Sequence, residues 1–94
     1  MNIIAADDER IALQLLISSI NEAVPEAQVH GFGSGEEALA FGSENPCEVA
    51  FLDIDMSDMD GIALAKHLKQ VNSKINIIFV TAYTKYAMEA LSLH

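Results

Sequence analysis

Short apolar runs, separated by segments of helical periodicity, constrain the fold of this chain more than any other feature of its sequence. The strong runs cover residues 3–6, 49–52 and 75–80, and a weaker run covers residues 28–32. Each has the length of a β-strand, and the strong runs are apolar along nearly their whole length. Strands of this kind are typical of parallel sheets that helices cover on both faces. The sequence therefore predicts an α/β fold with right-handed crossovers.

Two helices are expected before the second strong run. The first covers residues 11–24 and ends before Pro25, which cannot continue a helix. Its apolar residues at helical spacing are Ala12, Leu16, Ile20 and Ala23. The second begins at Ser34-Gly35-Glu36-Glu37, which has the form of a capping box, and runs to about Gly42.

Two further helices are expected after the second strong run. Gly61 introduces the third, and Ile62, Ala65 and Leu68 are predicted to share one face of it. The fourth runs from about residue 83 to the end of the chain. Strands and helices therefore alternate four times, which agrees with a parallel sheet.

Charge composition narrows the possible functions. The chain has 14 Asp and Glu against 5 Lys and Arg, which gives a formal net charge of −9. Its basic residues form no cluster in the sequence, whereas a nucleic-acid-binding domain needs a basic face. Direct binding to DNA, RNA or anionic lipid is therefore not expected. Metal cations and basic protein surfaces suit this charge better.

The same sequence favours a cytoplasmic domain. No apolar stretch approaches the ~18 residues of a membrane span. The N-terminus, MNIIAADDER, turns acidic too early for a secretory signal. A single cysteine, Cys47, excludes an internal disulfide and a Cys-based zinc site, and its apolar neighbourhood favours a core position. We expect one domain over residues 1–94, in the cytoplasm and away from membranes.

Polar side chains follow three predicted strands at the same relative place. Asp7 and Asp8 follow the first strand, Asp53 ends the third, and Thr81 follows the fourth. Parallel strands bring their carboxyl ends to one edge of the sheet, where open α/β folds bind ligands. We therefore expect these side chains to lie close together.

A cluster of carboxylates favours a bound cation. Two carboxylates at 4 Å repel by about 4 kcal/mol at an effective dielectric constant near 20. Mg²⁺ suits such a site because it binds one or two carboxylates, keeps waters and shares its shell with phosphoryl oxygens. An Asp carboxylate can itself carry a phosphoryl group, and a hydroxyl such as that of Thr81 could donate a hydrogen bond to it.

The motifs together resemble the receiver domain of two-component response regulators. They are Asp7-Asp8-Glu9, Phe51-Leu52-Asp53-Ile54-Asp55-Met56 with Met59-Asp60-Gly61, and Phe79-Val80-Thr81-Ala82, in order along nearly the whole chain. The segment TAYTKYAMEA, residues 81–90, is similar to the subset of receivers that carries LytTR-type DNA-binding output domains. The resemblance implies a three-layer flavodoxin-like fold with sheet order 2-1-3-4 and a role in transcription regulation.

The resemblance also implies a role for each motif residue. Asp53 would accept the phosphoryl group, and Thr81 would be the switch hydroxyl beside the small residue Ala82. The Mg²⁺ ligands would be Asp7, Asp8, Asp53 and the backbone carbonyl of Asp55. The donor would be a phosphohistidine on a sensor histidine kinase. The receiver would catalyse this transfer to itself and would not be a turnover enzyme.

Two features depart from the family pattern. Ser57 stands where the family usually has a proline, which changes the stiffness of the loop. The chain also stops within the fourth helix, so the family's fifth strand, its lysine beside the phosphoacceptor and its last helix have no counterpart. None of Lys66, Lys69, Lys74 and Lys85 matches the motif of that lysine. Residues 75–80 would then form an exposed apolar edge, which predicts pairing with a second copy of the chain.

Two alternative functions stay open. One is a receiver-like interaction module that acts without phosphorylation. The other is a haloacid-dehalogenase-like phosphatase, because Asp53-Ile54-Asp55 resembles the D-x-D pair of that family. In that family the pair sits on the first strand with its other acidic motif downstream, whereas here the acidic pair lies upstream. Among single residues, Asp8 could instead cap the helix after it, and Asp58 and Asp60 are expected as loop and cap residues.

Overall fold

The computed structural model of the protein describes residues 1–80 and 82. Strands and helices alternate along these residues. In chain order they are β1 (Asn2–Ala6), α1 (Arg10–Ala23), β2 (Gln28–Phe32), α2 (Gly35–Glu44), β3 (Val49–Asp53), α3 (Gly61–Val71) and β4 (Asn76–Val80). Thr81 and the predicted fourth helix lie outside the described residues.

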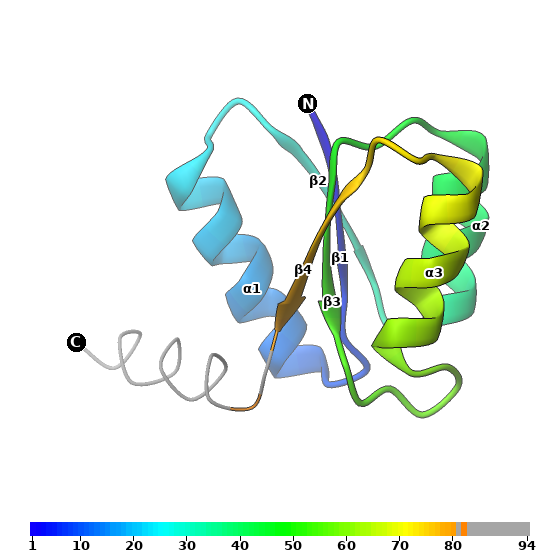
Figure 1. The fold of residues 1–94 in the computed structure, drawn as a ribbon. Helices are drawn as coiled ribbons and strands as arrows, with labels where there is room; N and C mark the ends of the chain where they lie inside the picture. The colour runs from blue at the N-terminus through cyan, green and yellow to red at the C-terminus, as the bar shows by residue number, and fades with distance from the viewer. Residues whose placement is uncertain (81, 83–94) are drawn as a thin grey trace.

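The described strands form one parallel sheet in the order β2-β1-β3-β4. Helix α1 covers one face of this sheet, and α2 and α3 cover the other (Figure 1). The predicted α/β fold with sheet order 2-1-3-4 is therefore confirmed. Because β1 and β3 are adjacent and parallel, the residues at their carboxyl ends meet at one edge of the sheet.

Strand β1 is buried on both faces, which explains its unbroken apolar run. Successive side chains of a strand point to opposite faces. Ile3 and Ala5 therefore pack against the α1 side, while Ile4 and Ala6 belong to the core beneath α2 and α3. All four are at most 2% exposed. The sheet thus separates two apolar cores, and the end of β1 is fixed from both sides.

Helix α1 lies one residue earlier than predicted at each end. Ala12, Leu16 and Ile20 are buried as predicted, but Ala23 is exposed. The buried stripe advances by four residues at a time, so its next member is the half-buried Val24, which caps the helix C-terminus. The expected apolar face was therefore right in its phase and wrong at its last residue.

Helix α3 buries a different set of residues from the one predicted. Ala65 and Leu68 are buried, but Ile62 is 48% exposed while Leu64 is fully buried. The buried residues are Gly61, Leu64, Ala65 and Leu68. Their spacing of i, i+3, i+4 and i+7 defines one face of a helix, and Ile62 lies outside it.

The remaining predictions for the elements differ from the structure only at their ends. The hydroxyl oxygen of Ser34 accepts a hydrogen bond of 3.1 Å from the N–H of Glu37, as the capping-box pattern predicts. Helix α2 continues to Glu44, two residues beyond the predicted end. Ile75 is buried but precedes β4, which begins at Asn76.

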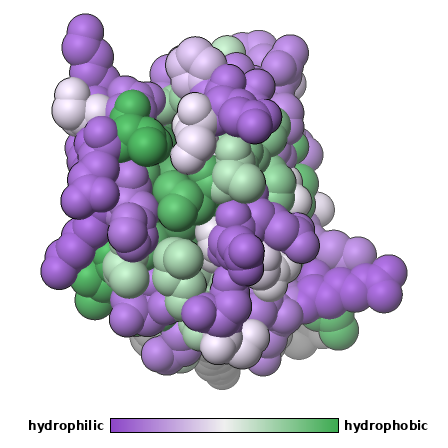
Figure 2. Space-filling view, turned by 90° about the vertical axis from the view of Figure 1, so that its right-hand side faces the viewer, coloured by the Kyte–Doolittle hydropathy of each residue, from purple (hydrophilic) through white to green (hydrophobic). Residues whose placement is uncertain are grey.

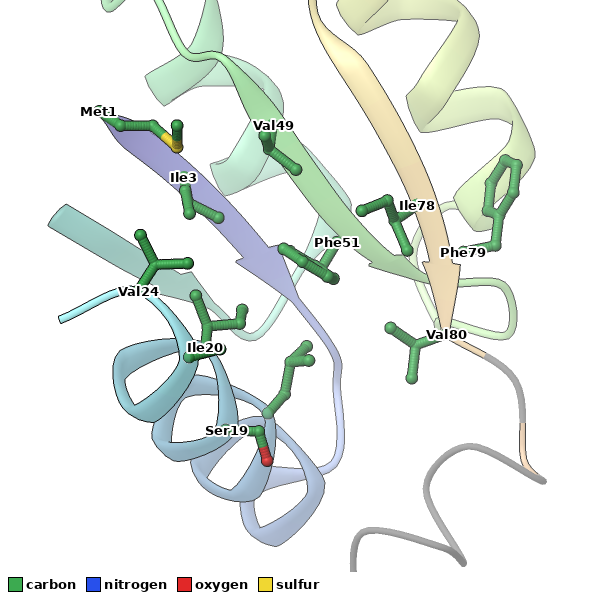
Figure 3. A pocket seen from close by; sticks show the side chains of 12 residues that line it. Met1, Ile3, Ser19, Ile20, Val24, Val49, Phe51, Ile78, Phe79 and Val80 are labelled. Atoms are coloured by element: carbon green, nitrogen blue, oxygen red, sulfur yellow. The ribbon is translucent and has the colours of Figure 1, made fainter. Parts of the chain in front are cut away.

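Strand β4 forms an apolar edge of the described sheet. Among residues 1–80 and 82 it pairs with β3 alone. Ile78 is 44% exposed and Phe79 is 40% exposed. Both residues line a hollow of about 360 Å³, although Ile78 points towards the α1 side of the sheet and the Phe79 side chain points the other way (Figure 3). Among the described residues that line this hollow, Ser19 is the only polar one.

The opposite side of the molecule also exposes apolar side chains. Seen from the side of α2 and α3, apolar atoms gather between hydrophilic side chains (Figure 2). A shallow apolar surface on this side includes Ile62, Ile77 and Phe79, with Lys66 and Lys69 at its border. No described helix has the length and apolar character that crossing a bilayer requires.

Candidate functional site

The carboxyl ends of β1 and β3 bring three aspartates together. Asp7 and Asp8 directly follow β1, and Asp53 is the last residue of β3. One carboxylate oxygen from each of the three lies within 4.8 Å of the others. Asp7 is 1% exposed and Asp53 is 4% exposed, whereas Asp8 is exposed. The predicted convergence of these side chains is therefore present.

Backbone N–H groups hold each of these carboxylates. Asp7 accepts a hydrogen bond of 2.9 Å from the N–H of Glu9, and Asp53 accepts one of 3.4 Å from the N–H of Asp55. Asp8 accepts one of 2.9 Å from the N–H of Ser57, in the loop after β3. These hydrogen bonds orient the three carboxylates, so the backbone of the loops after β1 and β3 determines the arrangement of the cluster.

The suggestion that Asp8 caps the helix after it is wrong. The N-cap position of α1 is occupied by Glu9. The side chain of Asp8 is directed to Ser57 instead, 49 residues further along the chain. A local capping pattern could not reveal this, because the contact depends on β1 and β3 being neighbours in the sheet.

The donor set of the cluster fits a hard divalent cation. Two of its carboxylates are almost completely buried, and like charges at this separation repel. Carboxylate oxygens at the rim of a sheet are ligands that Mg²⁺ accepts, and the exposed Asp8 leaves the site open to water. The chain therefore has an acidic cluster that could hold such an ion.

Gly61 allows the start of α3 to approach this site closely. A Cβ at this position would overlap the backbone carbonyl oxygen of Asp53. The N–H of Gly61 donates a hydrogen bond of 2.8 Å to the carbonyl oxygen of Ile54. In the sequence, Gly61 marks the start of a helix and belongs to the motif Met59-Asp60-Gly61. Its contact with Asp53 is a further constraint that a helix-start pattern does not contain.

Two other aspartates of the loop between β3 and α3, Asp58 and Asp60, bind the N-termini of helices. Asp60 is the N-cap of α3 and accepts a hydrogen bond of 2.8 Å from the N–H of Ala63. Asp58 caps a different helix: it accepts bonds from the N–H groups of Gly35 at 3.0 Å and Glu36 at 2.9 Å. The Glu36 and then the Gly35 N–H group lower the pKa of the Asp58 carboxyl. The four aspartates between residues 53 and 60 therefore do not form one site. Asp53 belongs to the carboxylate cluster, whereas Asp58 and Asp60 cap helices.

Three predicted roles are not tested by this geometry. Asp55 is exposed and its carboxylate is not one of the three clustered ones, and the role predicted for its backbone carbonyl stays a prediction. Thr81 lies outside the described residues, and Ala82 is described and exposed. Their roles as switch hydroxyl and small neighbour also stay predictions.

Comparison with known proteins identifies the family. The family model of the response regulator receiver domain matches residues 3–94. The transcriptional regulatory protein YpdB of Escherichia coli K12 is 36% identical over 93 residues, which cover 99% of this chain and 38% of that relative. The sensory transduction protein LytT of Bacillus anthracis is 32% identical over 94 residues, which cover 99% of this chain and 38% of that relative. The chain therefore spans 38% of the length of each of these two relatives.

A solved structure agrees with this assignment. The response regulator TrrA of Thermotoga maritima, crystallised in complex with Mg²⁺-BeF, matches with a TM-score of 0.79 and 27% identity. The match covers 98% of this chain and 78% of that chain. The resemblance predicted from the motifs is confirmed, and the LytT and YpdB relatives agree with the predicted subset. The chain belongs to the response regulator receiver domain family.

Proposed function

We propose that Asp53 accepts a phosphoryl group from a phosphohistidine of a sensor histidine kinase, with Mg²⁺ held by Asp7, Asp8 and Asp53. The observation that carries this proposal is the convergence of three carboxylates, two of them buried, at the ends of β1 and β3. Membership of the receiver family supports it. So does the relative TrrA, whose structure contains Mg²⁺-BeF.

The transfer uses a carboxylate oxygen of Asp53 as the nucleophile. The new O–P bond forms as the P–N bond to the donor imidazole breaks, and the imidazole nitrogen keeps the electron pair of that bond. Bound Mg²⁺ would neutralise charge on the phosphoryl oxygens. Asp7, Asp8, Asp53 and the backbone carbonyl of Asp55 would hold this ion. The Thr81 hydroxyl would move towards the phosphoryl group and donate a hydrogen bond to it, and the small residue Ala82 would leave room for that movement.

Phosphoryl uptake by the isolated chain tests this proposal. With Mg²⁺ and acetyl phosphate, intact-mass analysis should show one added phosphoryl group per chain. Asp53→Asn should abolish the gain. Asp60→Asn is a matched control that should retain it, because it changes the same loop and Asn is also a good N-cap.

The same assay separates the alternatives. Absence of any gain in mass, when a full-length receiver treated in parallel gains it, would reject the phosphoacceptor role and favour an interaction module. Release of many phosphates per Asp53 from a generic phosphate ester would instead indicate a phosphatase. A single gain of mass agrees with a stoichiometric acceptor that does not turn over.

We also propose where the phosphoryl donor acts and which output the domain controls. The donor is a sensor kinase in the cytoplasm, and the output is transcription, as the name of YpdB suggests for that relative. The net charge of −9 makes direct contact of this domain with nucleic acid unfavourable. We propose in addition that two copies of the chain pair through β4, because this strand exposes apolar side chains and, among the described residues, pairs with another strand on one side only.

A further inference from the structure

The loop between β3 and α3 joins the carboxylate cluster to helix α2. The two carboxylate oxygens of Asp58 accept hydrogen bonds from consecutive N–H groups, those of Gly35 at 3.0 Å and Glu36 at 2.9 Å. These groups open α2 and have no partner within the helix itself. The next residue, Met59, packs on the same helix start, where a Cβ on Gly35 would lie 3.1 Å from its Cβ. Side-chain contacts therefore anchor the loop to α2.

The residue before Asp58 contacts the cluster directly. The N–H of Ser57 donates a hydrogen bond of 2.9 Å to Asp8. A carboxylate has about four lone-pair sites, so this bond leaves Asp8 able to bind a cation as well. Adjacent residues of one loop thus hold Asp8 on one side and α2 on the other.

Asp8 needs such support more than its two neighbours do. Asp7 and Asp53 are confined by burial, whereas the side chain of Asp8 is exposed and can rotate. Repulsion from two nearby carboxylates drives that rotation away from the cluster. The bond from Ser57 opposes it, provided that the loop itself does not move.

We propose, on the basis of the proposed function, that Asp58 is a positioning residue of the metal site. By anchoring the loop to the first turn of α2, it keeps the Ser57 N–H where it directs Asp8 towards Asp7 and Asp53. Residues that do not bind the metal themselves but orient one of its ligands commonly strengthen metal binding. Metal binding and the start of α2 are then coupled, and the coupling is reciprocal.

Binding of Mg²⁺ to the whole chain, without a phosphoryl donor, tests this role. Asp58→Ala should weaken Mg²⁺ binding by about fivefold or more relative to Asp60→Ala, measured by calorimetry. Both variants remove one negative charge and one helix cap from the same loop, so their general electrostatic effects are matched. Asp58→Asn, which keeps an acceptor oxygen, should recover part of the loss. Equal affinities of Asp58→Ala and Asp60→Ala would overturn the proposal.

Hydrogen exchange of the unaltered chain provides a second test if Asp58→Ala does not fold. Saturation with Mg²⁺ should slow exchange of the Gly35 and Glu36 amides, and unchanged exchange would overturn the coupling. Phosphoryl uptake is measured separately. A chain that shows the Asp58 effect on Mg²⁺ binding but takes up no phosphoryl group would reject the phosphoacceptor role alone. A chain that takes up the group normally, with equal affinities of the two variants, would reject the positioning role alone.

Discussion

At the scale of single residues, the site depends on how closely its parts approach one another. Asp53 lies at the end of a buried strand, and the start of α3 is packed on its backbone. Only the absence of a side chain at Gly61 permits that contact. The packing of Gly61 on the Asp53 backbone therefore helps to position Asp53, although Gly61 takes no part in the proposed chemistry.

Gly61→Ala tests this dependence. The added methyl group would overlap the Asp53 carbonyl oxygen, so we expect the free energy of unfolding to fall by about 1–3 kcal/mol in urea titrations. Gly33→Ala is the control, because a Cβ there meets nothing within 4 Å and its φ is not positive. It should leave stability unchanged or raise it by up to about 1 kcal/mol. Equal stability of the two variants would contradict the close packing at Asp53.

At the scale of helices and strands, α3 shows how one helix face determines burial. Leu64 is fully buried beneath the sheet, while Ile62, two residues away, is about half exposed. Leu64→Ala should lower the free energy of unfolding by about 2–5 kcal/mol, because it leaves a cavity in the core. Ile62→Ala should change it by about 0.5 kcal/mol at most. The reverse order in chemical denaturation would show that the predicted face, not the observed one, is buried.

The sequence could predict features that follow from continuous patterns. The unbroken apolar runs predict buried parallel strands, and this topology alone brings Asp7 and Asp53 together. The burial of Leu64 in place of Ile62 could not be predicted, since both are apolar and adjacent to the same face. The sequence also does not predict the contact of Asp58 with the start of α2. Asp58 lies 23 positions after Gly35 and 22 positions after Glu36, too far for a local pattern to reveal. Such contacts exist only once the sheet has brought both loops to one edge.

At the scale of the whole molecule, stability should respond to the cation. Bound Mg²⁺ would relieve the repulsion among the three carboxylates of the folded chain, whereas the unfolded chain does not hold these carboxylates together. We expect about 2.7 kcal/mol of added stability at a hundredfold excess over its dissociation constant. Thermal unfolding with and without Mg²⁺ measures this gain. Asp8→Ala should reduce it, whereas Asp60→Ala should retain it, and no response in the unaltered chain would contradict the metal site.

The acidic charge and the apolar edge of β4 act in opposite directions on self-association. Copies that each carry a formal charge of −9 repel, but this repulsion is screened by salt. The exposed Ile78 and Phe79 favour pairing that is independent of that charge. Two β4 edges related by a two-fold axis could pair as antiparallel strands, which gives a closed dimer instead of an open chain of copies.

Light scattering over a range of concentration and salt tests this pairing. We expect a dimer that strengthens as ionic strength rises. Phe79→Lys should weaken it, because a lysine on an edge strand opposes pairing with another strand. Ile11→Lys is the matched control: Ile11 is 69% exposed but lies on α1, so it should leave the dimer intact. A monomer at every concentration and salt level would show that repulsion between the acidic surfaces outweighs the apolar edge.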